Sequence, residues 1–317
     1  MQGFDPRYRD PPDFILGVTR EIWEDRGIDT LLRSYAPDIV VRSPASIVVG
    51  NSGVIGATMA TLAEFPDRAL LGEDVIWQED GAGGFLSSHR LLSTATHLGD
   101  GAYGPATGRR LRYRIIADCH ASAGVIDDEW LVRDQGAIVR QMGSTPEAYA
   151  RARLAAGAPA PFTPARDRPG PYGARGDENE WGERHADLLA RLMRGDLAAV
   201  PKVYDRAVEL QGPGGVTGHG WDACDRFWLG LRAAFPDALF RVEHRMGRED
   251  PRLPPRSALR WSLHGAHSGW GAFGAPTGRE VYVMGMSHAE WGPRGLRRDW
   301  TLWDETAVWM QVLPEAA

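Results

Sequence analysis

Two histidines occupy matching places in a glycine-rich motif that the chain contains twice. Residues 97–109 read HLGDGAYGPATGR and residues 267–279 read HSGWGAFGAPTGR, with eight of thirteen positions identical. The imidazole group titrates near neutral pH and can therefore act as a general acid or base. His97 and His267 are therefore candidate catalytic residues. The alternative is that each histidine caps its glycine turn through hydrogen bonds to the backbone.

A second group of candidates lies further along each copy: His120 and Asp134 in the first, and His288 and Asp304 in the second. On a hairpin, Asp134 would stand about eight residues, roughly 26 Å, from the residue opposite His120. That distance excludes a shared proton. We therefore expect Asp134 to form a cross-strand ion pair with Arg114, and both aspartates to be structural. A catalytic role for the two aspartates and for His288 is the alternative.

Two further carboxylates share a repeat position near the start of the last expected strand. These are Glu129 and Asp299, and we expect both to be solvated at the rim of the fold. The two cysteines, Cys119 and Cys224, do not occupy matching positions, which favours two buried thiols over a disulfide framework. Too few metal-ligating side chains are grouped to predict a metal site.

The composition indicates a soluble globular protein. Of 317 residues, 43% are hydrophobic and 25% are charged, and the net charge is −6. This charge gives no basic surface for nucleic acid or for an anionic membrane. No apolar segment approaches the roughly 20 residues of a membrane span, and the N-terminus shows no secretory signal. We expect a cytoplasmic protein, and the arginine bias is typical of a high-GC bacterial genome.

The repeat extends well beyond the glycine motif and defines the domain organisation. A constant offset of 170 residues relates Phe65-Pro66-Asp67 to Phe235-Pro236-Asp237, and Gln141 to Gln311. One slip is expected between residues 120 and 299, where the second copy would have a longer turn. We predict a first domain at 1–143, an irregular linker at 144–182 and a second domain at 183–317.

Hydrophobic periodicity predicts the same order of elements in both copies. Asp13 is the expected N-cap of the first helix. Helices are expected at 13–25, 28–35 and 53–64, and at 183–194, 196–204 and 221–234. Strands are expected at 38–42, 69–79, 86–97, 110–121 and 125–139, and at 207–211, 239–248, 258–267, 280–289 and 297–311. The predicted fold class is α+β: two tandem cone-shaped modules, each a curved antiparallel sheet wrapped around about three helices.

This ordered set of motifs resembles the SnoaL-like polyketide cyclases of the nuclear transport factor 2-like superfamily. The resemblance covers about 13–143 and 183–313. In the first copy it is carried by Gly50, 65–67, His97, Gly99, 107–109, Glu129-Trp130, Asp134 and 141–143. In the second copy it is carried by 195–196, 235–237, His267, Gly269, 276–279, Asp299-Trp300 and Asp304.

The resemblance implies cofactor-independent ring closure by an aspartate on the last strand and an opposing histidine. The family pattern places that aspartate at Leu131 and Thr301. It places the histidine near Ala117 in the first copy, and at Ser287 or His288 in the second. The first copy therefore lacks the acid/base pair, and the second keeps at most the histidine.

Strand alternation selects the side chains expected to line the interior of each cone. Tyr113 and Leu131 fall on the apolar face of their strands. His89 is a candidate for a pocket that differs between the copies, because Leu259 takes its place in the second copy. In the second copy the expected lining residues are Trp261, Thr301 and Trp303. Aromatic surface of this kind binds flat apolar ligands or packs a core.

The sequence thus predicts a protein that takes a small apolar or polyketide-like molecule, with no cofactor, nucleic acid or membrane partner. The leading interpretation is a cyclase, dehydratase or isomerase type of acid/base enzyme. The alternative is a non-catalytic small-molecule-binding pseudo-dimer, and a protein-interaction adaptor is a third class. We expect the two domains to pair within one chain, which leaves room for further oligomerisation.

Overall fold

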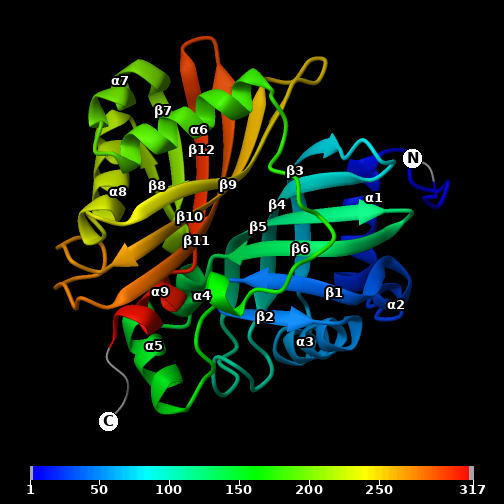
Figure 1. Ribbon diagram of the computed structural model, residues 1–317. Coiled ribbons are helices and arrows are strands. Elements are labelled where there is room, and N and C mark those ends of the chain that lie inside the picture. Colours follow the sequence, from blue (N-terminus) through cyan, green and yellow to red (C-terminus); the bar gives the residue numbers. More distant parts are fainter. Residues whose placement is uncertain (1–2, 314–317) are drawn as a thin grey trace. The chain divides into compact units, whose positions relative to one another are not determined.

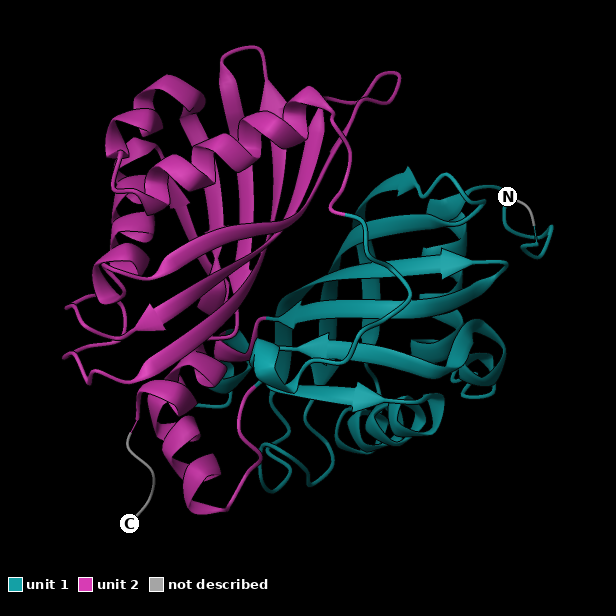
Figure 2. Ribbon diagram, in the orientation of Figure 1, with its two compact units in different colours: residues 1–133, 137–145, 162–174 teal, residues 134–136, 146–161, 175–317 magenta. Residues whose placement is uncertain are grey.

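The computed structural model describes residues 3–313, which divide into two compact units (Figures 1 and 2). The terminal residues 1–2 and 314–317 of the two predicted domains lie outside the described residues. We call the units module one (1–133, 137–145 and 162–174) and module two (134–136, 146–161 and 175–317).

Module one is built on a six-stranded sheet with the order β2-β1-β6-β5-β4-β3. Its strands are β1 (Tyr35–Ser43), β2 (Ser46–Val49), β3 (Ala69–Glu79), β4 (Phe85–Thr96), β5 (Arg110–Ser122) and β6 (Val125–Arg133). Its helices are α1 (Pro11–Trp23), α2 (Thr30–Ser34), α3 (Asn51–Glu64), most of α4 (Gln135–Gln141) and the short η1 (Pro164–Arg166).

Module two repeats this plan with the strand order β8-β7-β12-β11-β10-β9. Its strands are β7 (Tyr204–Gly212), β8 (Val216–His219), β9 (Leu239–Arg248), β10 (Arg256–Ala266), β11 (Glu280–Gly292) and β12 (Gly295–Trp303). Its helices are α5 (Pro146–Ala155), α6 (Glu180–Met193), η2 (Leu197–Ala199), α7 (Val200–Val203), η3 (Pro213–Gly215), α8 (Trp221–Ala234) and α9 (Glu305–Val312). No helix within residues 3–313 is both long and apolar enough to cross a membrane.

Each sheet is mixed, whereas the sequence predicted antiparallel pairing throughout. The meander β3–β6 is antiparallel, but β1 pairs with β6 in parallel, and β7 pairs with β12 in the same way. The parallel pair arises because β1 leaves for a hairpin and a helix before the meander begins. The last strand of the meander, β6, then runs beside β1 in the same direction. As a result β6 lies inside the sheet, between β1 and β5.

The first helix begins two residues earlier than predicted, and its N-cap lies three residues earlier. Asp10, and not Asp13, is the N-cap of α1, and its carboxylate accepts a hydrogen bond from the Asp13 amide at 2.9 Å. Prolines fit the first turn of a helix because their missing N–H has no intrahelical partner there. The Pro11-Pro12 pair therefore starts the helix rather than preceding it.

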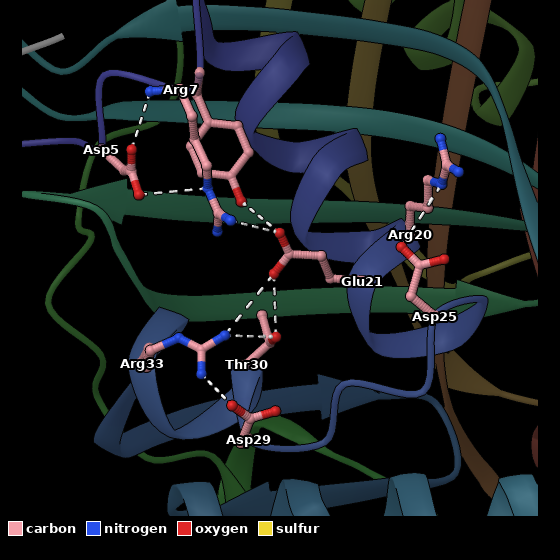
Figure 3. Close-up of polar contacts among 9 residues, drawn as sticks. Asp5, Arg7, Arg20, Glu21, Asp25, Asp29, Thr30 and Arg33 are labelled. Atoms are coloured by element: carbon pink, nitrogen blue, oxygen red, sulfur yellow. Dashed lines mark hydrogen bonds and ion pairs between the residues drawn. The ribbon is translucent and has the colours of Figure 1, made fainter.

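A cluster of polar contacts joins α1 to the segment before it and to α2 (Figure 3). The Glu21 carboxylate on α1 accepts from the Thr30 hydroxyl at 3.1 Å and forms an ion pair with Arg7 at 2.9 Å. Arg33 lies 4.0 Å from the same carboxylate and also bonds to Thr30. These contacts fix the two helices together at their polar side, while the apolar side of α1 is buried against the sheet.

The two longest predicted strands end early, and a helix follows each. The sequence predicted strands at 125–139 and 297–311, but β6 ends at Arg133 and β12 ends at Trp303. Asp304 caps α9, accepting hydrogen bonds from the backbone amides of Thr306 and Ala307 at 2.8 and 3.1 Å. A short apolar run cannot be assigned to strand or helix by periodicity alone. Before the second run, Asp304 is the signal that decides for a helix.

The slip between the copies lies elsewhere than predicted. β5 and β6 map onto β11 and β12 at an offset of 170 at both ends, so the turn between residues 120 and 299 has no insertion. The extra residue lies in the first hairpin instead. Ser43 pairs with Ser46 across two turn residues, whereas Gly212 pairs with Val216 across three. Gly214 in that longer turn has a φ of 79°, which glycine adopts without strain.

Candidate functional site

Three neighbouring strands of each sheet present one face to the module interior, and we call it the interior face. Residues that pair across β4, β5 and β6 form rows on this face, about 6.6 Å apart. In module one, in order along the strands, the rows are Ser87-Cys119-Glu129, His89-Ala117-Leu131, Leu91-Ile115-Arg133 and Ser93-Tyr113. In module two they are Ser257-Ala289-Asp299, Leu259-Ser287-Thr301, Trp261-Gly285-Trp303 and Leu263-Val283.

Glu129 is the most unusual side chain of the interior face of module one. It is 8% exposed, and burial raises the pKa of its carboxyl to about 7. The hydroxyl of Tyr35 and the thiol of Cys119 act against this shift as hydrogen-bond donors, and the charge of Asp128 adds to it. A carboxyl with a pKa near 7 is populated in both protonation states at neutral pH, which is what acid/base chemistry requires.

The titratable side chains Tyr35, Cys119 and His89, which share the interior with Glu129, are neutral. Burial, with the Glu129 charge, raises the pKa of Tyr35 and of the Cys119 thiol well above their ordinary values. His89, one row away, is also buried, and burial lowers the pKa of its ring to about 4. Its Nδ1 lies 3.4 Å from the hydroxyl oxygen of Ser87. His89 is therefore an uncharged imidazole at neutral pH, one row from Glu129 and two strands away on the same interior face.

The other end of the same face is cationic. Arg68, just before β3, is 2% exposed, and its guanidinium lies 4.1 Å from the centre of the Trp23 ring. Its Nε donates to the Ser93 hydroxyl at 3.3 Å, and the Tyr113 ring is 6.0 Å away. The charges of Arg68 and Arg133 lower the pKa of Tyr113 against the opposing effect of burial.

The interior of module two holds a closed polar chain instead. The Asp299 carboxylate accepts from the Tyr204 hydroxyl at 2.7 Å and from the Thr301 hydroxyl at 2.8 Å. The chain continues through Ser287, which lies 2.7 Å from Thr301 and accepts from the Trp261 indole at 3.0 Å. Burial raises the pKa of Asp299 to about 6.

Aromatic side chains fill the space that faces this chain. A Cβ atom added to Gly285 would lie 2.1 Å from the Trp261 ring, so the indole lies directly against the backbone there. Trp303 and Trp228 have ring centres 6.2 and 6.5 Å from that of Trp261, and Phe240 is 5.7 Å away. The tryptophans predicted to line a pocket therefore pack the core of module two.

Two family models match the sequence, one for each module. The SnoaL-like polyketide cyclase family matches residues 14–142, and the SnoaL-like domain family matches residues 185–295. This chain is a tandem SnoaL-like protein. The match to a polyketide cyclase family supports a cofactor-independent cyclase or isomerase type of function in general.

Solved structures that resemble the tandem SnoaL-like protein are about as long as one module. IdmH from Streptomyces antibioticus, a putative polyketide cyclase, is 23% identical and covers 43% of this chain and 99% of its own, with a TM-score of 0.38. AclR from Streptomyces galilaeus, a putative hydroxylase, is 20% identical over 42% and 94%, with a TM-score of 0.37. A search of curated proteins gave no match.

The positions that the family pattern assigns to catalysis pair with each other in both modules. Ala117 lies opposite Leu131, and Ser287 lies opposite Thr301. Ser287, rather than His288, is therefore the counterpart of Ala117. Neither module of the tandem SnoaL-like protein has the aspartate and histidine at these two positions.

The remaining predicted candidates lie away from the interior face. His97 bonds through Nδ1 to the Thr107 hydroxyl at 3.0 Å and through Nε2 to the Glu64 carboxylate at 3.2 Å. That carboxylate also accepts from the amides of Ala102 and Tyr103, so His97 belongs to a contact network that shapes the glycine turn. These contacts favour the turn-capping interpretation.

In module two the equivalent contacts are fewer. His267 keeps its partner Thr277, with Nδ1 and Oγ1 3.2 Å apart, but Ala234 stands where module one has Glu64. His288 is buried on the opposite face of β11, where it pairs with Trp300. The structure does not bring His288 and Asp304 together on the interior face.

The ion pair expected between Asp134 and Arg114 does not form. Asp134 lies past the end of β6 and accepts hydrogen bonds from the amides of Gly214 and Gly215 at 2.7 and 2.9 Å. Arg114 on β5 instead bonds to Glu73 on β3, across the intervening strand β4, at 2.8 Å. The prediction was wrong because it extended the strand through residue 139, which kept Asp134 within the hairpin.

Glu129 and Asp299 were the residues that sequence reasoning misplaced. Both were expected at a solvated rim, and both are buried. The signal was present, because Glu129 is two residues from Leu131 and so shares its interior face. The expectation treated the first residues of the last strand as exposed, whereas residues on both sides of Glu129 in β6 are also buried. Within residues 3–313, no group of three His, Cys, Asp or Glu side chains is placed to hold a metal ion.

Proposed function

We propose that module one carries out acid/base chemistry on a small apolar ketone, with Glu129 as the group that takes and returns the proton. The observation that carries this proposal is a buried carboxyl with a pKa of about 7 on the interior face. At neutral pH about half of a group with this pKa is deprotonated and can accept a proton from the substrate.

The reaction begins when the Glu129 carboxylate takes a proton from a carbon next to a carbonyl group. The electron pair of the broken C–H bond moves to the carbonyl oxygen and forms an enolate. Protonated Glu129 then returns its proton to a different carbon, which gives an isomerase. If the enolate carbon first attacks a second carbonyl of the same molecule, a ring closes and the proton goes to the new alkoxide. This second route is the cyclase outcome.

Neighbouring groups support this role through their charge state. The neutral Tyr35 hydroxyl donates a hydrogen bond to the Glu129 carboxylate. This bond stabilises the charged form of Glu129, while Tyr35 keeps its own proton. His89 is neutral and buried one row away, and can hydrogen-bond to a substrate oxygen. The apolar surroundings strengthen both interactions, because few competing solvent dipoles are present.

Module two is assigned a non-catalytic role in this proposal. Both carboxylate oxygens of Asp299 already accept hydrogen bonds from Tyr204 and Thr301, and the Trp261 ring packs in front of the sheet. A substrate would have to displace these satisfied groups. Asp299 therefore provides a matched control, since it occupies the repeat position of Glu129 in the module whose interior is filled by tryptophan rings.

The test measures proton removal directly. 2-Tetralone, a flat apolar ketone, is incubated with the protein in deuterated buffer near neutral pH, and loss of its C1 protons is followed by NMR. We expect the wild-type protein to accelerate exchange, Glu129→Gln to reduce that acceleration at least a hundredfold, and Asp299→Asn to retain it. The rate should rise with pH through about pH 7, as Glu129 becomes deprotonated.

Two results would contradict the proposal. One is exchange in the wild-type protein no faster than in buffer. The other is equal acceleration by Glu129→Gln and the wild-type protein. Retained binding of the ketone with no exchange would favour the non-catalytic binding protein. Circular dichroism of both variants checks that the loss is not caused by unfolding.

A further inference from the structure

We infer that module one selects substrates that carry a carboxylate, and that Arg68 binds this group at the end of the interior face opposite Glu129. The inference deepens the proposed function and rests on it for the reaction, but not for the binding. The ligand class is an elongated, largely apolar molecule with an anionic group at one end and a reactive carbonyl at the other.

Arg68 is a buried cation without an anionic partner. Within residues 3–313 no carboxylate forms an ion pair with it, and its Nη1 atom is buried and makes no hydrogen bond. The carboxylate of the adjacent Asp67 is directed elsewhere, since it accepts from the amide and the hydroxyl of Thr96, both at 2.6 Å. A buried charge without a counter-charge is unfavourable, so a protein rarely keeps one unless a ligand supplies the partner.

The groups around Arg68 are suited to an anion. The guanidinium rests on the Trp23 ring, which supports a cation but does not neutralise it. Ser93 uses its oxygen to accept from Nε, which leaves the Nη1 edge for a carboxylate oxygen. Tyr113 and Arg133 lie close enough for their charges to interact with that of Arg68. The charges of Arg68 and Arg133 together give this end of the interior face a positive potential.

The spacing of the rows fits one ligand reaching both ends. The row with Ser93 is three rows from the row with Glu129, about 20 Å along the strands. The rows between them contribute Leu91, Ile115 and Leu131, which form an apolar floor. An elongated, largely apolar molecule with a terminal carboxylate matches this pattern.

Comparison of the copies shows that the cationic end belongs to module one alone. Ala238 replaces Arg68, Val283 replaces Tyr113 and Trp303 replaces Arg133, all at the offset of 170. The fold is the same in both modules, so the cation is not needed to form it. This difference argues that Arg68 is kept for a ligand.

The test compares two probes of equal shape and different charge. Binding of 2-naphthoate and of the neutral 2-naphthamide is measured by isothermal titration calorimetry. We expect the wild-type protein to bind naphthoate at least tenfold more tightly than naphthamide. Arg68→Met should remove this preference, and Arg68→Lys should restore part of it. Arg114→Met, which removes a cation from the outer side of β5, is the control and should keep the full preference.

Several outcomes would overturn the inference: no binding of naphthoate, equal binding of the two probes, or an unchanged preference in Arg68→Met. The melting temperature of Arg68→Met should not fall, because the substitution removes an uncompensated charge, and this checks folding. Glu129→Gln should still bind naphthoate. If naphthoate binds but the rate of tetralone exchange does not depend on Glu129, the Arg68 carboxylate site is supported and the catalytic proposal fails. If exchange depends on Glu129 but naphthoate does not bind, the catalytic proposal is supported and the Arg68 carboxylate site is ruled out.

Discussion

At the scale of single residues, burial determines what Glu129 can do. The same carboxyl at the surface would be ionised at neutral pH and would be a weak base. Inside module one the charged form loses its hydration, and only Tyr35 and Cys119 compensate for it. Asp299 shows the same effect to a smaller extent: burial raises its pKa to about 6, while the Tyr204 and Thr301 hydroxyl groups donate to its two oxygens.

The shifted pKa of Glu129 makes stability depend on pH. Its pKa is raised to about 7 in the folded state from an ordinary value of 4.5. The folded state therefore binds more protons than the unfolded state between those values, and stability falls as pH rises through this window. Glu129→Gln should remove this contribution, which amounts to about 3 kcal/mol between pH 4.5 and pH 8.

Urea unfolding of the wild-type protein and Glu129→Gln at several pH values measures the effect. The difference between the two proteins isolates Glu129 from Asp299 and Asp304, which also have raised pKa values. A difference that does not change between pH 4.5 and pH 8 would show that Glu129 has an ordinary pKa in the folded protein.

At the scale of elements, the aspartate after the last strand of each module is a junction residue. Asp304 ends β12 and caps α9, and its carboxylate also accepts from the Thr306 hydroxyl at 2.7 Å. Asp134 occupies the same repeat position and binds two backbone amides of η3. Both side chains satisfy amides that would otherwise be left without partners.

Replacement of Asp304 should therefore affect stability and not chemistry. We expect Asp304→Ala to lower the free energy of unfolding by about 1–2 kcal/mol, and Asp304→Asn, which keeps a capping oxygen, to lower it less. Chemical denaturation gives both values. The rate of tetralone exchange should match that of the wild-type protein in each folded variant, and a large loss of exchange would return Asp304 to the catalytic candidates.

At the scale of the whole molecule, the chain contains the same fold in two tandem modules, and the side chains that fill the two interiors differ. Module one keeps titratable and cationic groups on its interior face, and module two fills the same rows with indole rings. The pair Leu91 and Ile115 of module one corresponds to Trp261 and Gly285 of module two. The large ring and the missing side chain compensate for each other.

This compensation predicts a strong coupling between the two positions of module two. Gly285→Ile alone should be severely destabilising, because the new side chain would overlap the Trp261 ring. Trp261→Leu alone should cost about 3 kcal/mol through the cavity it leaves. The double variant restores the pair of module one and should be more stable than the sum of the single changes, by more than about 1 kcal/mol.

Thermal and urea unfolding of the four proteins complete this double-mutant cycle. Additive effects would mean that the two side chains do not compete for the same space. Tetralone exchange in the double variant serves as the internal check, since the catalytic groups proposed in module one are untouched.

The sequence by itself determined the repeat, the family and most elements. β3, β9 and α8 have the predicted bounds, because alternating or helical apolar spacing and glycine or proline at the ends are local signals. Tertiary structure decided which groups are buried. The burial of Glu129 and of Arg68 depends on helices that are distant from them in the sequence. The pKa of a carboxyl depends on those neighbours, which is why the site emerged only when the modules were folded.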